Sequence, residues 1–418
     1  MTFPVTDRVP RRPPRAERGA ILVQVAVALI GLIGFSSFVV DYGVLWTARR
    51  QAQNAADAAA LAAAAAYGYG GGDEALARAA AIAAAQANLV WGEPPDITGG
   101  DVTFTTSCPA GAPEAGGGRC VRVDVFRNQQ RGNPLPAILG GVVGITEQGV
   151  RATATAEVLY GNRTSCVKPL AILDRWAEAG SPPWEPNGDT FDRYAPPPAV
   201  PGTLLANPDS YVGPTAGNNG TGLDLALDHG RQVILARRQD GYPDSTSWYF
   251  PVQFDCPGEA PGSIACFMAN VTGCSPQAVG AGDTILAHAG GFVGVDGINY
   301  LVPALGSVVA GDAGAYWEGA ANGGLGGVAG GCMANGTCSV SPRIIAVPAI
   351  DPDVWSAQGT YPPHDHPSVN ITRLVGLFIE QANGTEIVGR LMAYPSLPNT
   401  TDLGVPGAAF VVSTLLVR

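Results

Sequence analysis

The sequence predicts an α+β protein: an N-terminal transmembrane helix that continues into an Ala-rich helical stalk, followed by β-rich extracytoplasmic domains with disulfides. Three observations lead to this prediction. An uncharged, mostly apolar run over residues 20–40 leads into a segment that is almost entirely Ala at residues 55–66. The chain holds 56 Gly and 35 Pro, mostly after this segment, which favours turns and short strands. All eight cysteines lie at or after Cys108.

The apolar run has the length of a membrane span. As a helix rising about 1.5 Å per residue, residues 20–40 extend over about 31 Å, close to the hydrocarbon core of about 30 Å. Five Arg residues precede the run, and Arg49 and Arg50 follow it, so the positive-inside rule predicts a cytoplasmic N-terminus. Residues 1–18 are then a disordered cytoplasmic tail, and the chain after the span lies outside the cytoplasm.

Residues 19–90 are predicted to form this anchor and a helical stalk with a returning helix. Ala is the strongest helix former, so the first helix is expected to run from residue 20 to about residue 67, before a Gly-rich turn at residues 68–72. Asp73 is suited to cap a second helix over about 74–90. Glu74 and Arg78 are spaced for an i,i+4 ion pair within it.

Residues 91–160 are predicted to form a small sheet domain. Apolar and polar residues alternate as they do in strands at residues 101–106, 121–126 and 150–159. Residues 136–143 fit a short helix.

Residues 161–418 are predicted to form a Gly/Pro-rich, β-rich extracytoplasmic domain. Short apolar segments separated by Gly, Pro, Asn and Asp clusters predict its strands, at residues 232–236, 248–252, 284–287, 343–347, 373–379, 386–392 and 408–416. Residues 177–223 are Pro-rich and are interpreted as loop, as are the Gly-rich residues 318–331.

The cysteines are all candidates for disulfides, because an even number in an exported domain indicates oxidised pairs. Sequence alone does not select the pairing, and local pairs are the simplest hypothesis; Cys108 and Cys120 flank a Gly/Pro-rich connection between two predicted strands. The eight residues are Cys108, Cys120, Cys166, Cys256, Cys266, Cys274, Cys332 and Cys338.

Charge and motifs exclude several classes of function. The net charge is −11, and the chain after residue 18 is more acidic still, which argues against a nucleic-acid partner. Lys168 is the only Lys, and no phosphate-binding loop precedes it. Zinc-protease and nucleophile-elbow motifs are missing from the sequence. Residues 364–366 (His-Asp-His) place two imidazoles on one side of an extended segment, which is compatible with a metal site, but a rigid turn between the flanking prolines is the favoured interpretation. We therefore expect no catalytic, cofactor-binding or metal-binding residue, no cofactor and no enzymatic activity.

The N-terminal segment resembles a known family. An apolar span after Arg18 and Gly19 is followed by Asp41-Tyr-Gly43, and then by a run that begins Arg50-Gln51-Ala-Gln53-Asn54. In this order of features, residues 17–66 are similar to the N-terminal segment of TadG-like proteins of Tad-type (Flp) pilus assembly. A weaker resemblance, to a C-terminal block of some of these proteins, covers residues 166–176. The residues that carry the main resemblance are Arg18, Gly19, Asp41, Gly43, Arg50, Gln51, Gln53, Asn54 and Asp57, called the motif residues below.

The resemblance implies a function without catalysis. The chain is expected to be a membrane-anchored component of Tad-type pilus assembly or surface attachment, with the bilayer and other pilus-assembly proteins as partners. It implies a bacterial inner (cytoplasmic) membrane, with the C-terminal domain periplasmic or extracellular. A membrane-anchored surface-binding module or adhesin is the alternative, and an exported hydrolase is less favoured.

Processing of the N-terminus stays open from the sequence. The apolar run exceeds a usual secretory signal in length, which favours a retained signal anchor. Gly19 precedes the run as in pilins cut by prepilin peptidase, but Gln24 stands where pilins usually carry Glu.

Overall fold

A computed structural model of the chain describes residues 17–108, 119–161, 163–180, 183–187, 189–195, 199–200, 202–215, 218–237, 249–256, 258–288, 295–319, 326–353, 368–384, 386–395 and 410–417. The chain divides into two compact units, which are described separately. The first unit consists of Met1–Ala55, Ala85–Ile97 and Val125–Ala152. The second unit consists of Ala56–Ala84, Thr98–Asp124 and Thr153–Arg418.

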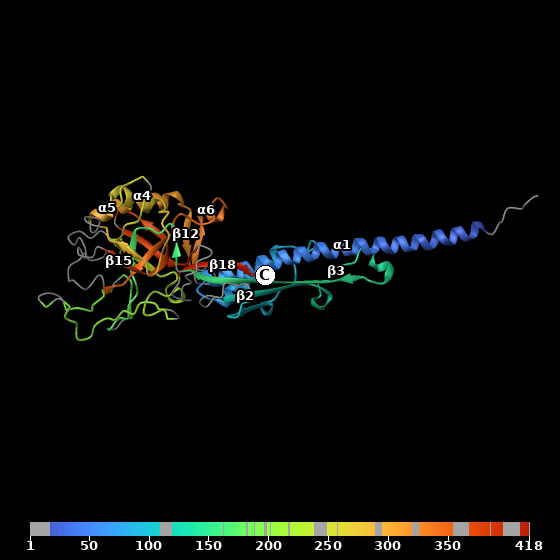
Figure 1. Ribbon diagram of the computed structural model, residues 1–418, viewed down its shortest axis with the longest axis horizontal. Helices are drawn as coiled ribbons and strands as arrows, with labels where there is room; N and C mark the ends of the chain where they lie inside the picture. Colours follow the sequence, from blue (N-terminus) through green and yellow to red (C-terminus); the bar gives the residue numbers. More distant parts are fainter. Residues whose placement is uncertain are drawn as a thin grey trace, which may run out of the picture. The chain divides into compact units, whose positions relative to one another are not determined.

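The long helix α1 (Glu17–Tyr69) contains both the predicted span and the predicted stalk (Figure 1). It is long and apolar enough to cross a membrane. Its large apolar side chains between Ile21 and Val40 are exposed, whereas the Ala residues from Ala55 to Ala64 that face inward are fully buried. One helix therefore contains both segments, as predicted: its first part has an exposed apolar surface, and its second part has a buried face of Ala.

The turn after α1 uses glycine, also as predicted. Gly71 and Gly72 have φ values of 65° and 92°, in the left-handed region that glycine adopts without strain. The second helix, α2 (Glu74–Ala87), begins directly after Asp73. Asp73 Oδ1 accepts hydrogen bonds from the backbone N–H groups of Ala75 and Leu76, at 2.7 and 3.0 Å, which satisfies the start of the helix. The Glu74–Arg78 ion pair forms at 3.2 Å.

A five-stranded sheet follows the two helices. The strands lie in the order β1 (Val102–Thr105), β2 (Arg119–Arg127), β5 (Val150–Gly161), β18 (Val411–Val417) and β17 (Tyr394–Pro395). Strand β18 pairs antiparallel with β5, with Val411 opposite Gly161. The sequence predicted strands β1, β2, β5 and β18, but it assigned β18 to residues 161–418 and not to this sheet. Pairing between strands so far apart in the chain leaves no local signal.

Residues 135–148 form a short hairpin in the first unit. Strand β3 (Leu135–Pro136) pairs antiparallel with β4 (Glu147–Gln148), and a 3-10 turn, η3 (Gly140–Val143), lies between them. The expected short helix over residues 136–143 is therefore wrong, apart from this single turn. The glycines at positions 140, 141 and 144 disfavour a longer helix.

The core of the second unit is a seven-stranded sheet. Its main path is β8 (Gln232–Arg237), β16 (Glu386–Met392), β15 (Ser368–Ala382), β14 (Ile344–Ile350), β7 (Leu170–Leu173) and β9 (Tyr249–Pro251), and β11 (Thr284–Leu286) also pairs with β15. The pairs are antiparallel except that of β14 with β7. Of the seven segments predicted as strands in residues 161–418, six contain strands of this sheet, and the seventh, residues 408–416, contains most of β18. Strand β7 was not predicted. The α+β prediction is confirmed.

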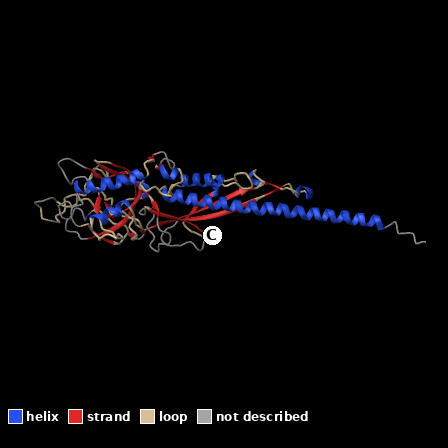
Figure 2. Cartoon of the chain, turned by 90° about the horizontal axis from the view of Figure 1, so that it is seen from above, coloured by secondary structure: helices blue, strands red, loops and turns tan. Residues whose placement is uncertain are grey.

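The two longer helices of the second unit that follow β9 were not predicted, and neither were the one-turn helices α3 (Leu225–Asp228) and α6 (Gly331–Ala334). Helix α5 (Val295–Gly311) packs against β15 and against α4 (Ile264–Thr272). Figure 1 labels the three elements, and Figure 2 distinguishes helices in blue from strands in red. Pro303 and three glycines inside α5 hide its helical pattern. Smaller elements complete the described part of the chain: η1 (Gly99–Asp101), η2 (Gln129–Arg131), β6 (Arg163–Thr164), α3 (Leu225–Asp228), β10 (Val279–Gly280), β12 (Ala315–Glu318), β13 (Gly327–Gly330) and α6 (Gly331–Ala334).

The eight cysteines form four disulfides: Cys108–Cys120, Cys166–Cys274, Cys256–Cys266 and Cys332–Cys338. Three of the pairs are local. The Cys166–Cys274 bond joins positions 108 residues apart, so local pairing does not hold throughout.

Replacing Cys108 and Cys120 by Ser is expected to destabilise the second unit by about 3 kcal/mol, because the bond restricts the unfolded chain. Their Cα atoms lie 5.5 Å apart. The variant should remain in the membrane fraction, since α1 is unchanged. Urea unfolding measures the loss, and peptide mapping without reduction tests the bond. If both cysteines are alkylated before reduction, the prediction is wrong.

Candidate functional site

The motif residues lie along α1, and two of them bind other segments of the first unit. Asp41 directly follows the apolar run and is 9% exposed. Its carboxylate accepts hydrogen bonds from the backbone N–H groups of Ile138 and Leu139, at 2.7 and 3.2 Å. A Cβ at Gly140 would lie only 3.0 Å from Asp41 Oδ2 and 2.7 Å from the carbonyl oxygen of Ile145. Glycine at position 140 therefore permits the hairpin to approach the carboxylate.

Gln51 makes the second attachment. Its Oε1 accepts a hydrogen bond from the backbone N–H of Trp91 at 2.8 Å. Trp91 has a φ of 51°, which is unfavourable for a bulky side chain, and it lies in a tight turn between Val90 and Glu93. The hydrogen bond from Trp91 thus helps to hold this strained turn against the helix.

The remaining motif residues are spread along α1. The guanidinium of Arg50 stacks over the ring of Trp46 at 3.9 Å. Gln53 and Asp57 are half-buried, and Asn54 is exposed. Nothing in the structure explains the glycine at position 43, because a Cβ there would have no neighbour within 4 Å. Arg18 and Gly19 lie in the first turn of α1, and their side chains are outside the described part.

The two segments that Asp41 and Gln51 hold are also joined to each other. Arg127, only 2% exposed, donates hydrogen bonds from Nη1 to Glu93 and Asn133. Arg131 pairs with Asp96 at 3.2 Å, and the backbones of Asp96 and Phe126 exchange two hydrogen bonds. These contacts join residues 93–96 to residues 126–133, which lead into the hairpin, so the segments that contact α1 also hold one another. The contacts involve no arrangement of nucleophile, base and acid.

In the second unit, the block at residues 166–176 contains the centre of a buried polar network. Asp174, fully buried at the end of β7, accepts hydrogen bonds from Arg373 Nε and Tyr211 Oη, at 2.8 and 2.7 Å. The backbone N–H of Leu223 donates to it at 2.8 Å. Arg373, 3% exposed, also donates to Asn219 Oδ1 at 2.6 Å. Burial raises the pKa of Tyr211, and the charge of Asp174 adds to this rise.

Lys168 in the same block is buried as well. Its Nζ donates a hydrogen bond to the carbonyl oxygen of Gly273, next to the Cys166–Cys274 disulfide. Burial lowers the pKa of Lys168 to about 8, because removal from water penalises the ammonium form. An exposed lysine in the unfolded chain titrates near 10.4.

Stability is therefore expected to rise from pH 7.5 to pH 9.5. Native Lys168 loses its proton in this range while the unfolded chain keeps it, so deprotonation favours the native state. The expected gain in unfolding free energy is about 2 kcal/mol. Urea unfolding at several pH values measures it. Lys168→Met should remove the rise, and an unchanged pH dependence in this variant would contradict the assignment.

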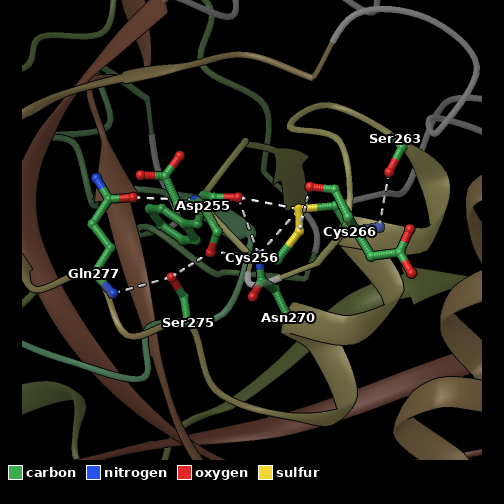
Figure 3. Close-up of a disulfide and its surroundings, with 9 residues drawn as sticks. Asp255, Cys256, Ser263, Cys266, Asn270, Ser275 and Gln277 are labelled. Atoms are coloured by element: carbon green, nitrogen blue, oxygen red, sulfur yellow. Dashed lines mark hydrogen bonds between the residues drawn. A yellow bond between two sulfur atoms is a disulfide. The ribbon is translucent and has the colours of Figure 1, made fainter.

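The Cys256–Cys266 disulfide has a densely bonded neighbourhood (Figure 3). Asn270, 2% exposed, lies beside it and donates from Nδ2 to the carbonyl oxygen of Phe254 at 3.2 Å. Ser275 Oγ donates to the carbonyl oxygen of Asp255 at 2.9 Å. The disulfide and these hydrogen bonds hold α4 and the residues after it against the segment that follows β9, which is a structural role.

A half-open cavity of about 380 Å³ also lies in the second unit. It is mainly apolar and includes His229, whose Nε2 lies 3.3 Å from the carbonyl oxygen of Gly326. Burial lowers the pKa of His229, so the ring is held neutral near pH 7. Within the described residues, His229 Nδ1 has no hydrogen-bond partner. The remaining wall is formed by Tyr69, Gly327, Val328, Met333, Ser339, Val340, Ile344, Met392, Ala393 and Pro395.

Sequence reasoning did not find the network around Asp174. The resemblance included Asp174. Tyr211 lies in the segment interpreted as loop and Arg373 begins a predicted strand, and neither position indicates a contact with Asp174. A charged residue inside the apolar strand pattern of residues 373–379 was the one available signal. The His-Asp-His turn at residues 364–366 lies outside the described residues.

Comparison with known proteins identifies the N-terminal segment. Residues 19–66 match the model of the Tad family, described as Flp pilus-assembly TadE/G-like. The match covers the span and most of the stalk part of α1, and with them Asp41 and Gln51. Searches among curated proteins and solved structures gave no match.

Proposed function

We propose that this protein is a non-enzymatic, membrane-anchored component of Tad-type (Flp) pilus assembly or surface attachment. The family match over residues 19–66 supports a pilus-related role. Helix α1 is the anchor, with its N-terminus in the bacterial cytoplasm and the rest of the chain periplasmic or extracellular. Its partners are the bilayer and other pilus-assembly proteins.

One observation carries the non-enzymatic part of the proposal. Two polar motif residues, Asp41 and Gln51, bind backbone N–H groups of their own chain. These hydrogen bonds attach the hairpin and the turn at Trp91 to α1, which is a structural role suited to a membrane anchor. Four disulfides support an oxidising compartment for the chain after the span.

Deleting the gene in the host bacterium tests the function. We expect fewer surface pili in electron micrographs and weaker attachment, restored by the full chain but not by a chain without residues 20–40. Asp41→Ala with Gln51→Ala should restore pili poorly. Asn54→Ala, which changes an exposed motif residue, is the matched control. Normal pili and attachment in the deletion strain would overturn the proposal.

Reporter fusions test the orientation separately. A reporter active only outside the cytoplasm, placed after Arg418, is expected to be active. Activity of a cytoplasmic reporter at the same position would reverse the assigned topology.

A further inference from the structure

We propose that the tip of the hairpin, residues 137–146, enters the surface of the lipid bilayer beside α1 and forms a second membrane contact. The proposal rests on the proposed function in one respect, because it requires α1 to span the membrane. The tip is the segment between β3 and β4 that Asp41 binds.

Asp41 fixes the depth of the tip. The run of apolar residues in α1 ends at Val40, so Asp41 stands where the span meets water. The backbone N–H groups of Ile138 and Leu139 lie within 2.7 and 3.2 Å of its carboxylate. The tip is therefore held at the level of the membrane surface.

Aromatic residues on α1 mark the same level. Tyr42 and Trp46, directly after the span, are 54% and 49% exposed. Tyr and Trp are enriched where a helix passes through the headgroup region, because their rings are apolar and their tips are polar. The tip lies beside this aromatic region along the helix.

A buried serine indicates that the tip reaches deeper than Asp41. Ser37, one turn before Asp41 and inside the apolar run, is 2% exposed, although its neighbour Phe38 is 65% exposed. A side chain on an otherwise bare helix is buried only where another segment covers it. The hairpin is the segment held one turn away, about 6 Å along the axis.

The surface of the tip suits lipid. Ile138, Leu139 and Ile145 are 54%, 37% and 53% exposed, close together in the chain. Residues 137–146 carry no charge, and the first charged residue after them is Glu147. Exposed apolar side chains at the end of a membrane span are covered most simply by the bilayer that the span already enters.

Spin labels on the full-length protein test this proposal. The protein is reconstituted in vesicles of phosphatidylethanolamine and phosphatidylglycerol and labelled at one added cysteine without prior reduction. The positions are Ile145→Cys in the tip, Leu32→Cys in the span and Val212→Cys, an exposed site in the second unit. Collision with oxygen, which concentrates in lipid, is compared with collision with a water-soluble nickel complex.

We expect the oxygen-to-nickel ratio at Ile145→Cys to be several-fold above that at Val212→Cys and to approach that at Leu32→Cys. Adding Asp41→Ala should lower the ratio at Ile145→Cys and leave Leu32→Cys unchanged, because the tip is released while the span remains.

The other outcomes separate the two proposals. A label in lipid at Leu32→Cys but in water at Ile145→Cys overturns the tip contact and leaves the anchor intact. Water at Leu32→Cys overturns the anchor itself. Spin–spin broadening at Ile145→Cys with low access to both reagents identifies a second copy of the chain as the cover, against the proposal. A high oxygen-to-nickel ratio at Val212→Cys as well would show that contact with lipid is not specific to the tip, against the proposal.

Discussion

Replacing Cys166 and Cys274 by Ser is expected to lower the unfolding free energy of the second unit by about 5 kcal/mol. The bond joins positions 108 residues apart, the longest separation among the four disulfides. In the loop-entropy relation, a longer closed loop restricts the unfolded chain more. Urea unfolding in detergent, followed by fluorescence of the buried Trp176 and Trp184, measures the loss.

The Cys332–Cys338 bond provides a matched control. It spans 6 residues, and the same relation gives about 2 kcal/mol for Cys332→Ser with Cys338→Ser. The two double variants differ from the native protein by the same chemistry, so loop length is the main variable. Equal losses in the two variants would contradict the expectation.

Arg373→Met is expected to cost about 3–5 kcal/mol, the usual result of removing one partner of a buried ion pair. Asp174 is fully buried, and the change would leave its carboxylate without the Nε–H donor at 2.8 Å. The double variant Asp174→Asn with Arg373→Met should lose less than the two single variants together, because no buried charge remains. Urea unfolding of the three variants gives the coupling energy.

Arg390→Met serves as the control for this prediction. Arg390 pairs with Glu380 at 3.0 Å, but the two side chains are 25% and 30% exposed. Partly solvated pairs contribute up to about 1 kcal/mol, so a small loss is expected. A loss as large as that of Arg373→Met would show that burial is not the cause.

The sequence predicted where most strands lie along the chain, but it did not predict which strands pair with each other. Short apolar segments between turn residues located β8, β14, β15 and β16. The continuous apolar pattern of β14 agrees with its burial at all seven positions. Which strands pair depends on which strands lie side by side in the folded sheet. Strand β18 joins β5 across some 250 positions of sequence, and no local property of either strand encodes that choice.

The site shows the same limit. Asp41 and Gln51 were identified through the family resemblance, but their partners, Ile138 and Trp91, lie 97 and 40 residues away. Residues 136–143 were predicted to form a short helix, but only the 3-10 turn Gly140–Val143 forms there, because glycines disfavour a longer helix. Buried partners such as Arg373 appear only when tertiary packing removes them from water.

The pairing of β5 with β18 has a consequence for modularity. Gly161, where β5 ends, stands opposite Val411, where β18 begins. The chain therefore leaves the five-stranded sheet and returns to it at two adjacent points. All strands of the seven-stranded sheet lie between these two points, as in a domain inserted into another. A two-residue type I′ turn such as Asn-Gly has the geometry to close antiparallel ends of this kind. Joining residues 161 and 411 through such a turn would remove the seven-stranded sheet together with β17 and would keep β1, β2, β5 and β18 of the five-stranded sheet.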